Sequence, residues 1–281
     1  MEFCINEMCL AGQGDLLSHI ADCAAQNVGY MELSKACLLA YLRSGGTPDA
    51  LRSAFLDGNI KPVCVNSIES VSFNTKRGAR VLREASEYLF YCCRAIGCDC
   101  VEVIGSFKPP TRDEAEIEAE TAEAIARLSD AARPYGIRLA LEYMGVADSS
   151  VQTFARALSI VRRIAREDVG LLVDTWHHYA SGSEAAELLE ARAGEVFMVH
   201  ISDCPAAAPL QASRADSYLP GEGDAPLGEL LRNLAAIGYD GPVSAEIFAP
   251  SIRALAPNEY IARAKAATLP LLKGAAPEAG W

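Results

Sequence analysis

The amino-acid sequence predicts a single (β/α)8 TIM barrel, and three observations support this prediction. The chain has 281 residues, a length that one large α/β barrel domain can fill. Eight short runs rich in Val, Ile and Leu are spread along the chain. Between them lie longer segments with apolar residues at every third or fourth position, which is the helical period. Runs with so few polar residues indicate parallel strands that helices cover on both faces.

The eight predicted strands and the helical segments alternate along the whole chain, so we expect one domain over residues 1–281. Pro134 and Gly136 end one helix just before a strand, and a Gly-Tyr-Asp-Gly-Pro turn at 238–242 precedes the last strand. The predicted strands are residues 3–7, 30–33, 60–66, 101–105, 138–142, 170–174, 196–201 and 242–247. Helical periodicity is clearest over residues 81–96, 117–128, 151–164, 227–234 and 260–271.

A doubly wound parallel sheet is the main alternative to the barrel. Such sheets usually have fewer strands and often carry a glycine-rich phosphate-binding turn after the first strand. The first turn here contains Gly12 and Gly14 but lacks the third glycine of that motif. The barrel is therefore the preferred interpretation, with a polar loop at 202–226 over its mouth and a loosely held tail at 273–281.

Charge and hydropathy exclude several classes of partner. Asp and Glu (37) outnumber Lys and Arg (25), so the net charge is −12, whereas nucleic-acid binding needs clustered basic residues. The N-terminus lacks the features of a secretory signal, and no stretch approaches the ~18 apolar residues that a membrane span needs. We therefore expect a cytoplasmic protein that binds neither nucleic acid nor membrane, while the oligomeric state, a homo-oligomer included, stays open.

The cysteines predict no disulfide framework. Nine of the ten lie in the first 100 residues at irregular spacings, and no CxxC pair occurs. In a chain without an export signal, such residues are typical of reduced thiols that pack as small core hydrophobes.

Four consecutive predicted strands end in side chains that can bind a metal. Functional residues of such barrels lie at the carboxyl ends of the strands. The fifth to eighth strands end at Glu142, Asp174, His200 and Glu246, which we call the strand-end cluster. The intervals of 32, 26 and 46 residues each correspond to one βα unit of about 30 residues, and the excess in the last interval matches the 202–226 loop.

The composition of the strand-end cluster predicts a divalent cation. A carboxylate at the end of an apolar strand is costly to bury unless it is paired or bound to a cation. Each of these residues alone is typical of an ordinary buried polar group, but three carboxylates that converge on one imidazole would repel one another without a metal. Oxygen donors with one nitrogen favour Mn²⁺, with Co²⁺, Mg²⁺ and Zn²⁺ as alternatives, and open coordination positions for a substrate.

Motifs around the strand-end cluster carry a resemblance to a known family. They are Glu142, Val-Asp-Thr-Trp-His-His at 173–178, Val-His-Ile-Ser-Asp at 199–203, Leu-Pro-Gly-Glu-Gly-Asp at 219–224 and Ser-Ala-Glu-Ile-Phe at 244–248. Together they resemble the sugar phosphate isomerase/epimerase family, the xylose isomerase-like TIM barrels, over nearly the whole chain. The resemblance implies that the cluster holds a divalent metal and that Glu142 and Glu246 transfer protons on opposite sides of a bound sugar.

Five further residues are predicted to contact the substrate. The resemblance implies that His177 and Arg214 bind substrate oxygens, although family members often place the arginine nearer the Pro-Gly turn, where this chain has Ser217. Glu32 resembles a recurrent acid of the second strand. Trp176 follows the Asp ligand by two residues and is a candidate apolar wall, and Asn66 ends the third strand as a candidate hydrogen-bond donor.

The predicted activity is the isomerisation or epimerisation of a keto-sugar, keto-inositol or similar polyhydroxylated carbonyl compound. Removing a proton next to the carbonyl creates an enediolate, which a divalent cation stabilises, and a carboxylate returns the proton to the same or the neighbouring carbon. Loss of a hydroxyl from the same intermediate gives the main alternative, a dehydratase of the inosose or 3-dehydroshikimate type. A non-catalytic sugar-binding barrel is a further alternative.

The histidines argue against a DNA-cleaving metalloenzyme of the same fold, which would need additional histidines on early strands. No histidine lies between His19 and His177. We expect His19 at the surface of the first helix, and His178 at the surface or in a supporting position behind the site. Glu7 and Glu102 are candidate pocket residues. The absence of a basic cluster favours an unphosphorylated substrate.

Overall fold

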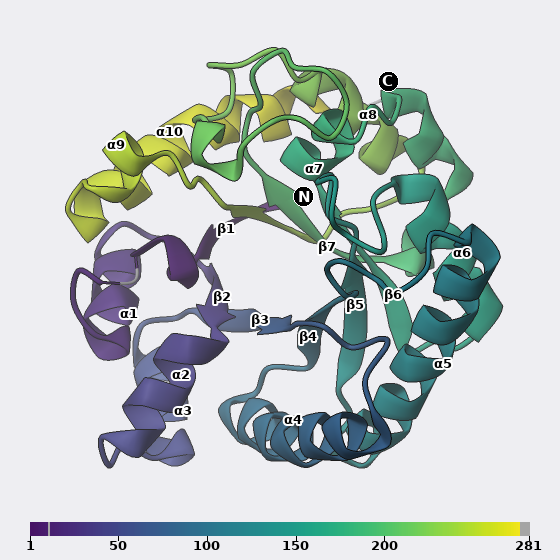
Figure 1. The fold of residues 1–281 in the computed structure, drawn as a ribbon. Coiled ribbons are helices and arrows are strands. Elements are labelled where there is room, and N and C mark those ends of the chain that lie inside the picture. The colour runs from purple at the N-terminus through teal and green to yellow at the C-terminus, as the bar shows by residue number, and fades with distance from the viewer. Residues whose placement is uncertain (11, 276–281) are drawn as a thin grey trace.

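Eight parallel strands close into a barrel in a computed structural model that describes residues 1–10 and 12–275. Each strand pairs with the next along the chain, and the last pairs with the first (Figure 1). This arrangement confirms the predicted (β/α)8 barrel and excludes the doubly wound sheet. The strands are β1 (Glu2–Asn6), β2 (Tyr30–Ser34), β3 (Lys61–Ile68), β4 (Cys100–Ile104), β5 (Arg138–Glu142), β6 (Val169–Asp174), β7 (Val196–Ile201) and β8 (Pro242–Ala245).

Helices surround the barrel and supply the outer layer of the core (Figure 1). The unit between β6 and β7 departs from the regular pattern, because short 3-10 helices follow α7 there. The helices are α1 (Leu16–Ala25), α2 (Lys35–Arg43), α3 (Pro48–Asp57), α4 (Lys76–Ile96), α5 (Glu114–Ala132), α6 (Phe154–Ile164), α7 (Thr175–Ala180), α8 (Leu227–Ala236), α9 (Pro250–Arg253) and α10 (Pro257–Ala275). No helix in these described ranges is long and apolar enough to cross a membrane.

Two helices between β2 and β3 were not predicted from periodicity. Both begin at capping residues: the Ser34 side chain accepts a hydrogen bond from the backbone N–H of Cys37, and the Thr47 side chain accepts one from Ala50. Capping hydroxyls satisfy amide groups that a helix start leaves unpaired. Thr47 followed by Pro48 is therefore the sequence signal for the start of α3.

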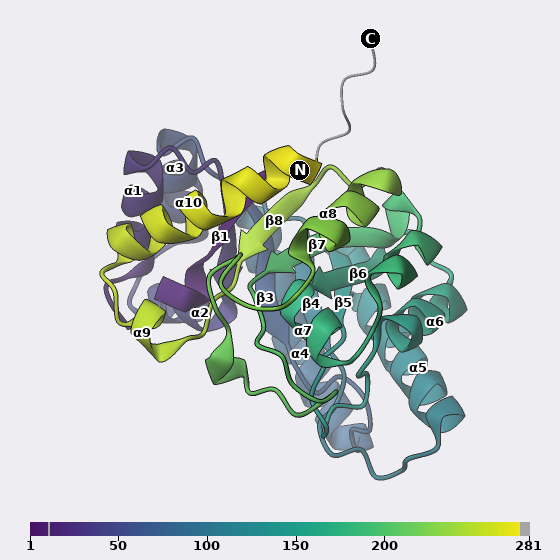
Figure 2. The ribbon, with the colours of Figure 1, turned by 90° about the horizontal axis from the view of Figure 1, so that it is seen from above.

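The 202–226 loop lies at the carboxyl end of the barrel. Figure 2 shows this green segment at the same end of the molecule as α7 and α9. The bridge between Asp203 and Tyr218 closes it, and it contains the short 3-10 helix Arg214–Asp216. Of the predicted tail at 273–281, residues up to 275 form the end of α10, and the rest lie outside the described residues.

The barrel interior below the mouth is apolar and contains thiols. The interior cluster combines cysteines of three strands with aliphatic side chains: Cys4, Val63, Cys64, Cys100, Ala140, Leu172 and Met198. All ten cysteines are free, and nine of them are buried. They pack as small hydrophobic residues inside the fold.

The expectation that His19 lies at the surface is wrong. Its side chain is buried, and Nδ1 lies 2.7 Å from Oε1 of Glu7, which is also buried. The other Glu7 oxygen accepts the backbone N–H of Ser34 at 3.1 Å. Burial disfavours the charged imidazole, but the hydrogen bond and charge of Glu7 outweigh this effect and raise the pKa of His19. Glu7, which directly follows β1, thus connects α1 through His19 with the end of β2 through Ser34. No hydrogen bond or ion pair in the described residues joins Glu7 to the strand-end cluster.

We expect His19→Leu to destabilise the protein because it leaves the buried Glu7 carboxylate without its charged partner. Breaking a buried pair in this way costs about 3–5 kcal/mol. Because folding raises the pKa of His19, its contribution is complete below the unfolded value of about 6.5 and declines as the pH rises through the folded pKa. Urea unfolding of both proteins from pH 5 to pH 9 measures the difference, and a gap that does not shrink with rising pH contradicts the assignment.

Candidate metal centre

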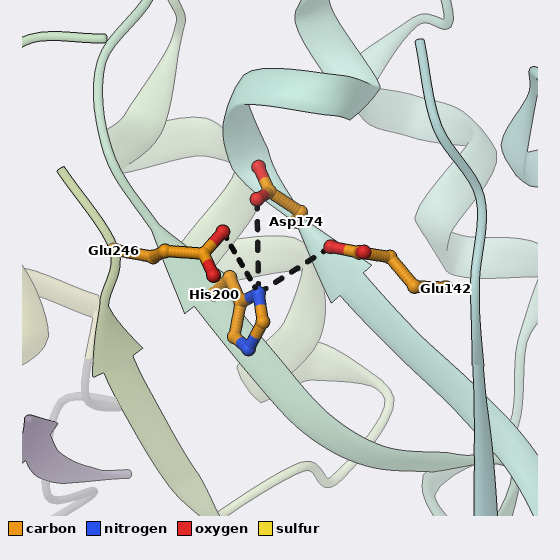
Figure 3. Close-up of side chains that lie close together, drawn as sticks. All are labelled: Glu142, Asp174, His200 and Glu246. Atoms are coloured by element: carbon orange, nitrogen blue, oxygen red, sulfur yellow. Dashed lines mark ion pairs between the residues drawn. The ribbon is translucent and has the colours of Figure 1, made fainter. Parts of the chain in front are cut away.

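Three carboxylates surround one imidazole nitrogen at the carboxyl ends of β5 to β8. Nδ1 of His200 lies 3.4 Å from Glu142 Oε1, 3.8 Å from Asp174 Oδ2 and 3.4 Å from Glu246 Oε2 (Figure 3). One potential ligand atom from each residue lies within 4.8 Å of all the others, and all four side chains are buried. The structure therefore brings together the strand-end cluster.

The barrel register explains this convergence. Asp174 is directly opposite His200 in the pairing of β6 with β7, and His200 pairs with Ser244 in β8. Glu246 follows the last residue of β8, and its backbone N–H still donates to the Ile201 carbonyl. Asp174 also caps α7, because its Oδ1 accepts the backbone N–H of His177 at 3.0 Å, which leaves Oδ2 for the cluster.

The strand-end cluster fits a divalent cation. Within the described part of the chain, His200 Nδ1 and Glu142 Oε1 are buried and make no hydrogen bond. Buried polar atoms without partners are costly, and three adjacent carboxylates repel one another. A cation satisfies both the unpaired atoms and the charge, and three oxygens with one nitrogen are a suitable donor set for Mn²⁺, Co²⁺, Mg²⁺ or Zn²⁺.

The cluster residues have strongly shifted pKa values. Burial raises the pKa of Glu142 to about 7, against the opposing effect of His200. Burial also acts to raise the pKa of Asp174, but contacts with His177 and His200 outweigh it and lower that pKa to about 2. Burial disfavours the charged form of His200, but Glu32 and Glu246 raise its pKa well above the usual range. Protons and a divalent cation are thus alternative ways to compensate the same negative charge.

Amide side chains at the end of β1 and within β3 hold Glu246. Its Oε1 accepts hydrogen bonds from Asn6 Nδ2 at 2.9 Å and from Asn66 Nδ2 at 3.2 Å. Arg214 lies 3.5 Å from Oε2. Burial would raise the pKa of Glu246, but the charges of His200 and Arg214 lower it. Glu246 is therefore held as a carboxylate, whereas Glu142 has a raised pKa.

A small cavity above the cluster contains three of the predicted substrate contacts. It is too narrow to admit even a water molecule, so a sugar-sized ligand requires the Arg214 side chain or the loop to move. The Arg214 guanidinium lies over the Phe248 ring at 4.4 Å. The lining residues are Asp174, Trp176, His177, Ser202, Arg214, Ser217, Glu246 and Phe248.

His177 has a defined hydrogen-bonding role in this cavity. Its Nδ1 accepts the backbone N–H of Gly145 at 3.0 Å, and burial lowers its pKa to about 4. The neutral ring therefore carries its proton on Nε2, which can donate to an oxygen atom. A side chain at position 145 would collide with the backbone carbonyl of His177, so this approach requires glycine. The edge of His177 also packs against Trp176, with 5.0 Å between ring centroids.

The other predicted residues lie around the strand-end cluster. Asn66 contacts Glu246 directly, as described above. Glu32 contacts His200 Nε2 at 2.9 Å and, like Asn66, does not belong to the cavity lining found among the described residues. Glu102 is buried nearby. His178 is buried behind the site, where Nδ1 lies 2.8 Å from the Tyr143 hydroxyl.

Sequence reasoning missed Asn6 and Phe248 as site residues. Asn6 is the last residue of β1, and a polar side chain at that position was the available signal. Phe248 follows Glu246 by two residues, and its place under Arg214 depends on a loop whose path the sequence does not reveal.

Asp203 organises the loop over the cavity. Its Oδ1 accepts the backbone N–H groups of Cys204 at 2.9 Å and Ala225 at 3.1 Å, and its Oδ2 accepts that of Gly221 at 2.9 Å. Charge-assisted bonds of this kind are stronger than neutral ones. One buried carboxylate thus joins the two ends of the loop that carries Arg214.

Comparisons with known proteins match the whole barrel. The model of the family described as Xylose isomerase-like TIM barrel matches residues 21–271. An inosose isomerase of Bacillus velezensis is 30% identical over 269 residues, which cover 95% of this chain and 96% of that protein. A crystal structure described as the IOLI protein with a binding zinc atom has a TM-score of 0.93 and 28% identity, covering 97% of this chain and 98% of the other.

A relative with another activity matches a smaller part of the chain. The 3-dehydroshikimate dehydratase of Pseudomonas aeruginosa is 28% identical over 173 residues, which are 61% of this chain and 27% of that longer protein. The similarity thus extends to proteins named for isomerisation and for dehydration.

We expect Asp203→Asn to loosen the 202–226 loop, because the new amide group opposes a backbone N–H that the carboxylate accepted. Losing one charge-assisted bond costs about 1.5–3 kcal/mol. Hydrogen exchange measured by mass spectrometry should show faster exchange in peptides from this loop. Asp216→Asn, an exposed change in the same loop, is the control, and equal exchange in both variants would refute the role of Asp203.

Proposed function

The chain belongs to the xylose isomerase-like TIM barrel family, and from that premise we propose that it is a divalent-metal-dependent isomerase or epimerase of a polyhydroxylated carbonyl compound. The observation that carries the proposal is the convergence of three buried carboxylates on His200 Nδ1. The full-length similarity to an inosose isomerase supports a keto-inositol substrate, and keto-sugars are the wider class. We further propose that the enzyme acts in the cytoplasm.

Glu142 and Glu246 are the proposed proton-transferring residues. They approach His200 from opposite sides (Figure 3), from β5 and from the end of β8. A divalent cation held by the strand-end cluster would act as a Lewis acid that stabilises negative charge on the substrate oxygens. A carboxylate beside the substrate removes the proton from the hydroxyl-bearing carbon next to the carbonyl. A proton returned to the former carbonyl carbon moves the carbonyl group, provided that the hydroxyl proton passes to the former carbonyl oxygen.

The cavity residues are proposed to bind and orient the substrate. The Nε2–H of His177 can donate to a substrate oxygen, and the Arg214 guanidinium can donate to another once the side chain leaves Glu246. Trp176 is the proposed apolar wall, and Asn66 keeps Glu246 in place beside the substrate. Manganese is the preferred metal in this proposal, because hard oxygen donors outnumber nitrogen in the cluster.

A dehydratase is the second candidate, favoured by the similarity to 3-dehydroshikimate dehydratase. Both reactions begin with removal of a proton next to a carbonyl. They differ afterwards, because dehydration requires a hydroxyl group to leave as water, and isomerisation retains every oxygen. Product analysis therefore separates the two candidates.

We expect the purified enzyme with Mn²⁺ to exchange one carbon-bound hydrogen of an inosose for solvent deuterium and to form an isomeric ketone. Proton NMR in D₂O detects both events. Glu142→Gln and Glu246→Gln should each slow turnover about 10²–10⁴-fold, the usual contribution of a general base. The control, Glu123→Gln, changes an exposed residue of α5 and should retain activity. An unsaturated product formed with loss of water would support the dehydratase instead.

We expect chelation with EDTA to abolish turnover and Mn²⁺ to restore it more fully than Co²⁺, Mg²⁺ or Zn²⁺. Elemental analysis of the purified protein should find about one divalent ion per chain, since the strand-end cluster provides one set of four donors. Full activity in protein shown to be free of metal would contradict the proposed role of the cluster.

A further inference from the structure

A fourth buried carboxylate, Glu32, contacts the His200 ring on the side that faces away from Glu142. Nε2 of His200 lies 2.9 Å from both Oε1 and Oε2 of Glu32, and both side chains are fully buried. Glu32 Oε2 also accepts a hydrogen bond from Asn6 Nδ2 at 3.1 Å. The two ring nitrogens therefore have different surroundings: Nε2 faces Glu32, and Nδ1 faces the carboxylates of the strand-end cluster.

This asymmetry determines which nitrogen of a neutral His200 can bind a metal. A neutral imidazole has one N–H and one lone pair, and the partner of one nitrogen sets the state of the other. A carboxylate at Nε2 stabilises the N–H there and leaves the lone pair on Nδ1. The reverse tautomer would place a lone pair against Glu32 and an N–H bond where the ligand atom is needed.

We propose that Glu32 is a positioning residue, which accepts the Nε2–H of His200 and thereby presents Nδ1 to the divalent cation. This inference rests on the proposed function, because it assumes that the strand-end cluster holds a metal. It also replaces the sequence-based expectation that Glu32 binds substrate, since His200 and Asn6 already occupy its oxygens. Carboxylates behind metal-bound histidines commonly affect metal affinity by 10–100-fold.

Asn6 extends this support to a second member of the cluster. The same Nδ2 atom that donates to Glu32 Oε2 lies 2.9 Å from Glu246 Oε1. A continuous chain of hydrogen bonds thus connects His200, Glu32, Asn6 and Glu246, which come from β7, β2, β1 and the end of β8. The position of the imidazole and that of one carboxylate ligand are therefore coupled through strands that carry no ligand of their own.

Glu102 provides a matched comparison. Its carboxyl group also lies within 4.8 Å of a His200 nitrogen and of Glu32, and it is buried. Its Oε2 atom has no hydrogen-bond partner among the described residues, and no hydrogen bond joins Glu102 to His200 there. Burial and the nearby Glu142 raise its pKa well above the usual range. Glu102→Gln therefore changes a carboxyl group at a similar place without removing the acceptor of Nε2.

The test compares wild-type protein, Glu32→Gln and Glu102→Gln. Both oxygens of Glu32 lie 2.9 Å from His200 Nε2, so a glutamine at 32 places its NH2 group, a donor, against the Nε2–H in either orientation of the amide. Competition with a chromophoric chelator measures the affinity for Zn²⁺, and ¹⁵N-histidine NMR of the zinc-loaded protein reports the protonated nitrogen of each of the four histidines. We expect Glu32→Gln to bind zinc 10–100-fold more weakly and to lose the Nε2–H signal of His200, while Glu102→Gln matches the wild type in both measurements.

Three other outcomes would contradict the positioning role of Glu32, and one of them would also contradict the proposed function. Wild-type affinity and an unchanged His200 signal in Glu32→Gln would refute the positioning role while leaving the proposed function intact. An equal loss of affinity in both variants would also refute it, because the effect would then not depend on the Nε2 acceptor. A wild-type protein that binds no divalent metal would overturn the proposed function and this inference together. Circular dichroism of each variant verifies that the fold is retained.

Discussion

The rest of the site depends on one electrostatic constraint, the mutual repulsion of the carboxylates around His200 Nδ1. Three carboxylates lie within 3.8 Å of this atom in the buried end of the barrel. Burying three carboxylates so close together is energetically unfavourable unless a positive charge compensates them. The closed barrel makes the arrangement rigid, because three members of the cluster lie at the carboxyl ends of strands and Glu246 directly follows one, and each of these strands is hydrogen-bonded on both sides. A metal centre with this charge could not be held equally well on mobile loops.

The two halves of the barrel contribute differently to this centre. The strand-end cluster, which holds the four proposed ligands, comes from β5 to β8. Strands β1, β2 and β3 provide Asn6, Glu32 and Asn66, which donate to or accept from Glu246 and His200. The first half therefore fixes orientation without adding a ligand. This division explains why polar residues are buried at the ends of strands that take no part in the proposed coordination.

The parts of the site that follow from spacing were predictable from the sequence. Asp174 and His200 lie at the carboxyl ends of successive strands, so a barrel places them side by side. Asn6 and Glu246 are 240 residues apart, and although the predicted barrel pairs the first strand with the last, no spacing pattern marks the amide of Asn6 as the partner of Glu246. The burial of His19 was missed for a related reason: its partner Glu7 lies in the preceding 3-10 helix, so the turn between them decides the contact.

The features that select a reaction lie above the cluster rather than within it. Isomerisation, epimerisation and dehydration share the first proton removal, so the same four ligands can serve all three. The reactions differ in which side chain of the enzyme contacts the hydroxyl that leaves in dehydration, or the carbon that receives the proton in isomerisation. Under the proposed function, the candidates for those positions are His177 and Arg214. The Arg214 side chain lies over Phe248 and is carried by a loop organised around Asp203. Because the cavity is small while Arg214 contacts Glu246, the proposed function requires the substrate to displace this arginine, and the energy of that exchange would then contribute to selectivity for the oxygen pattern of the substrate.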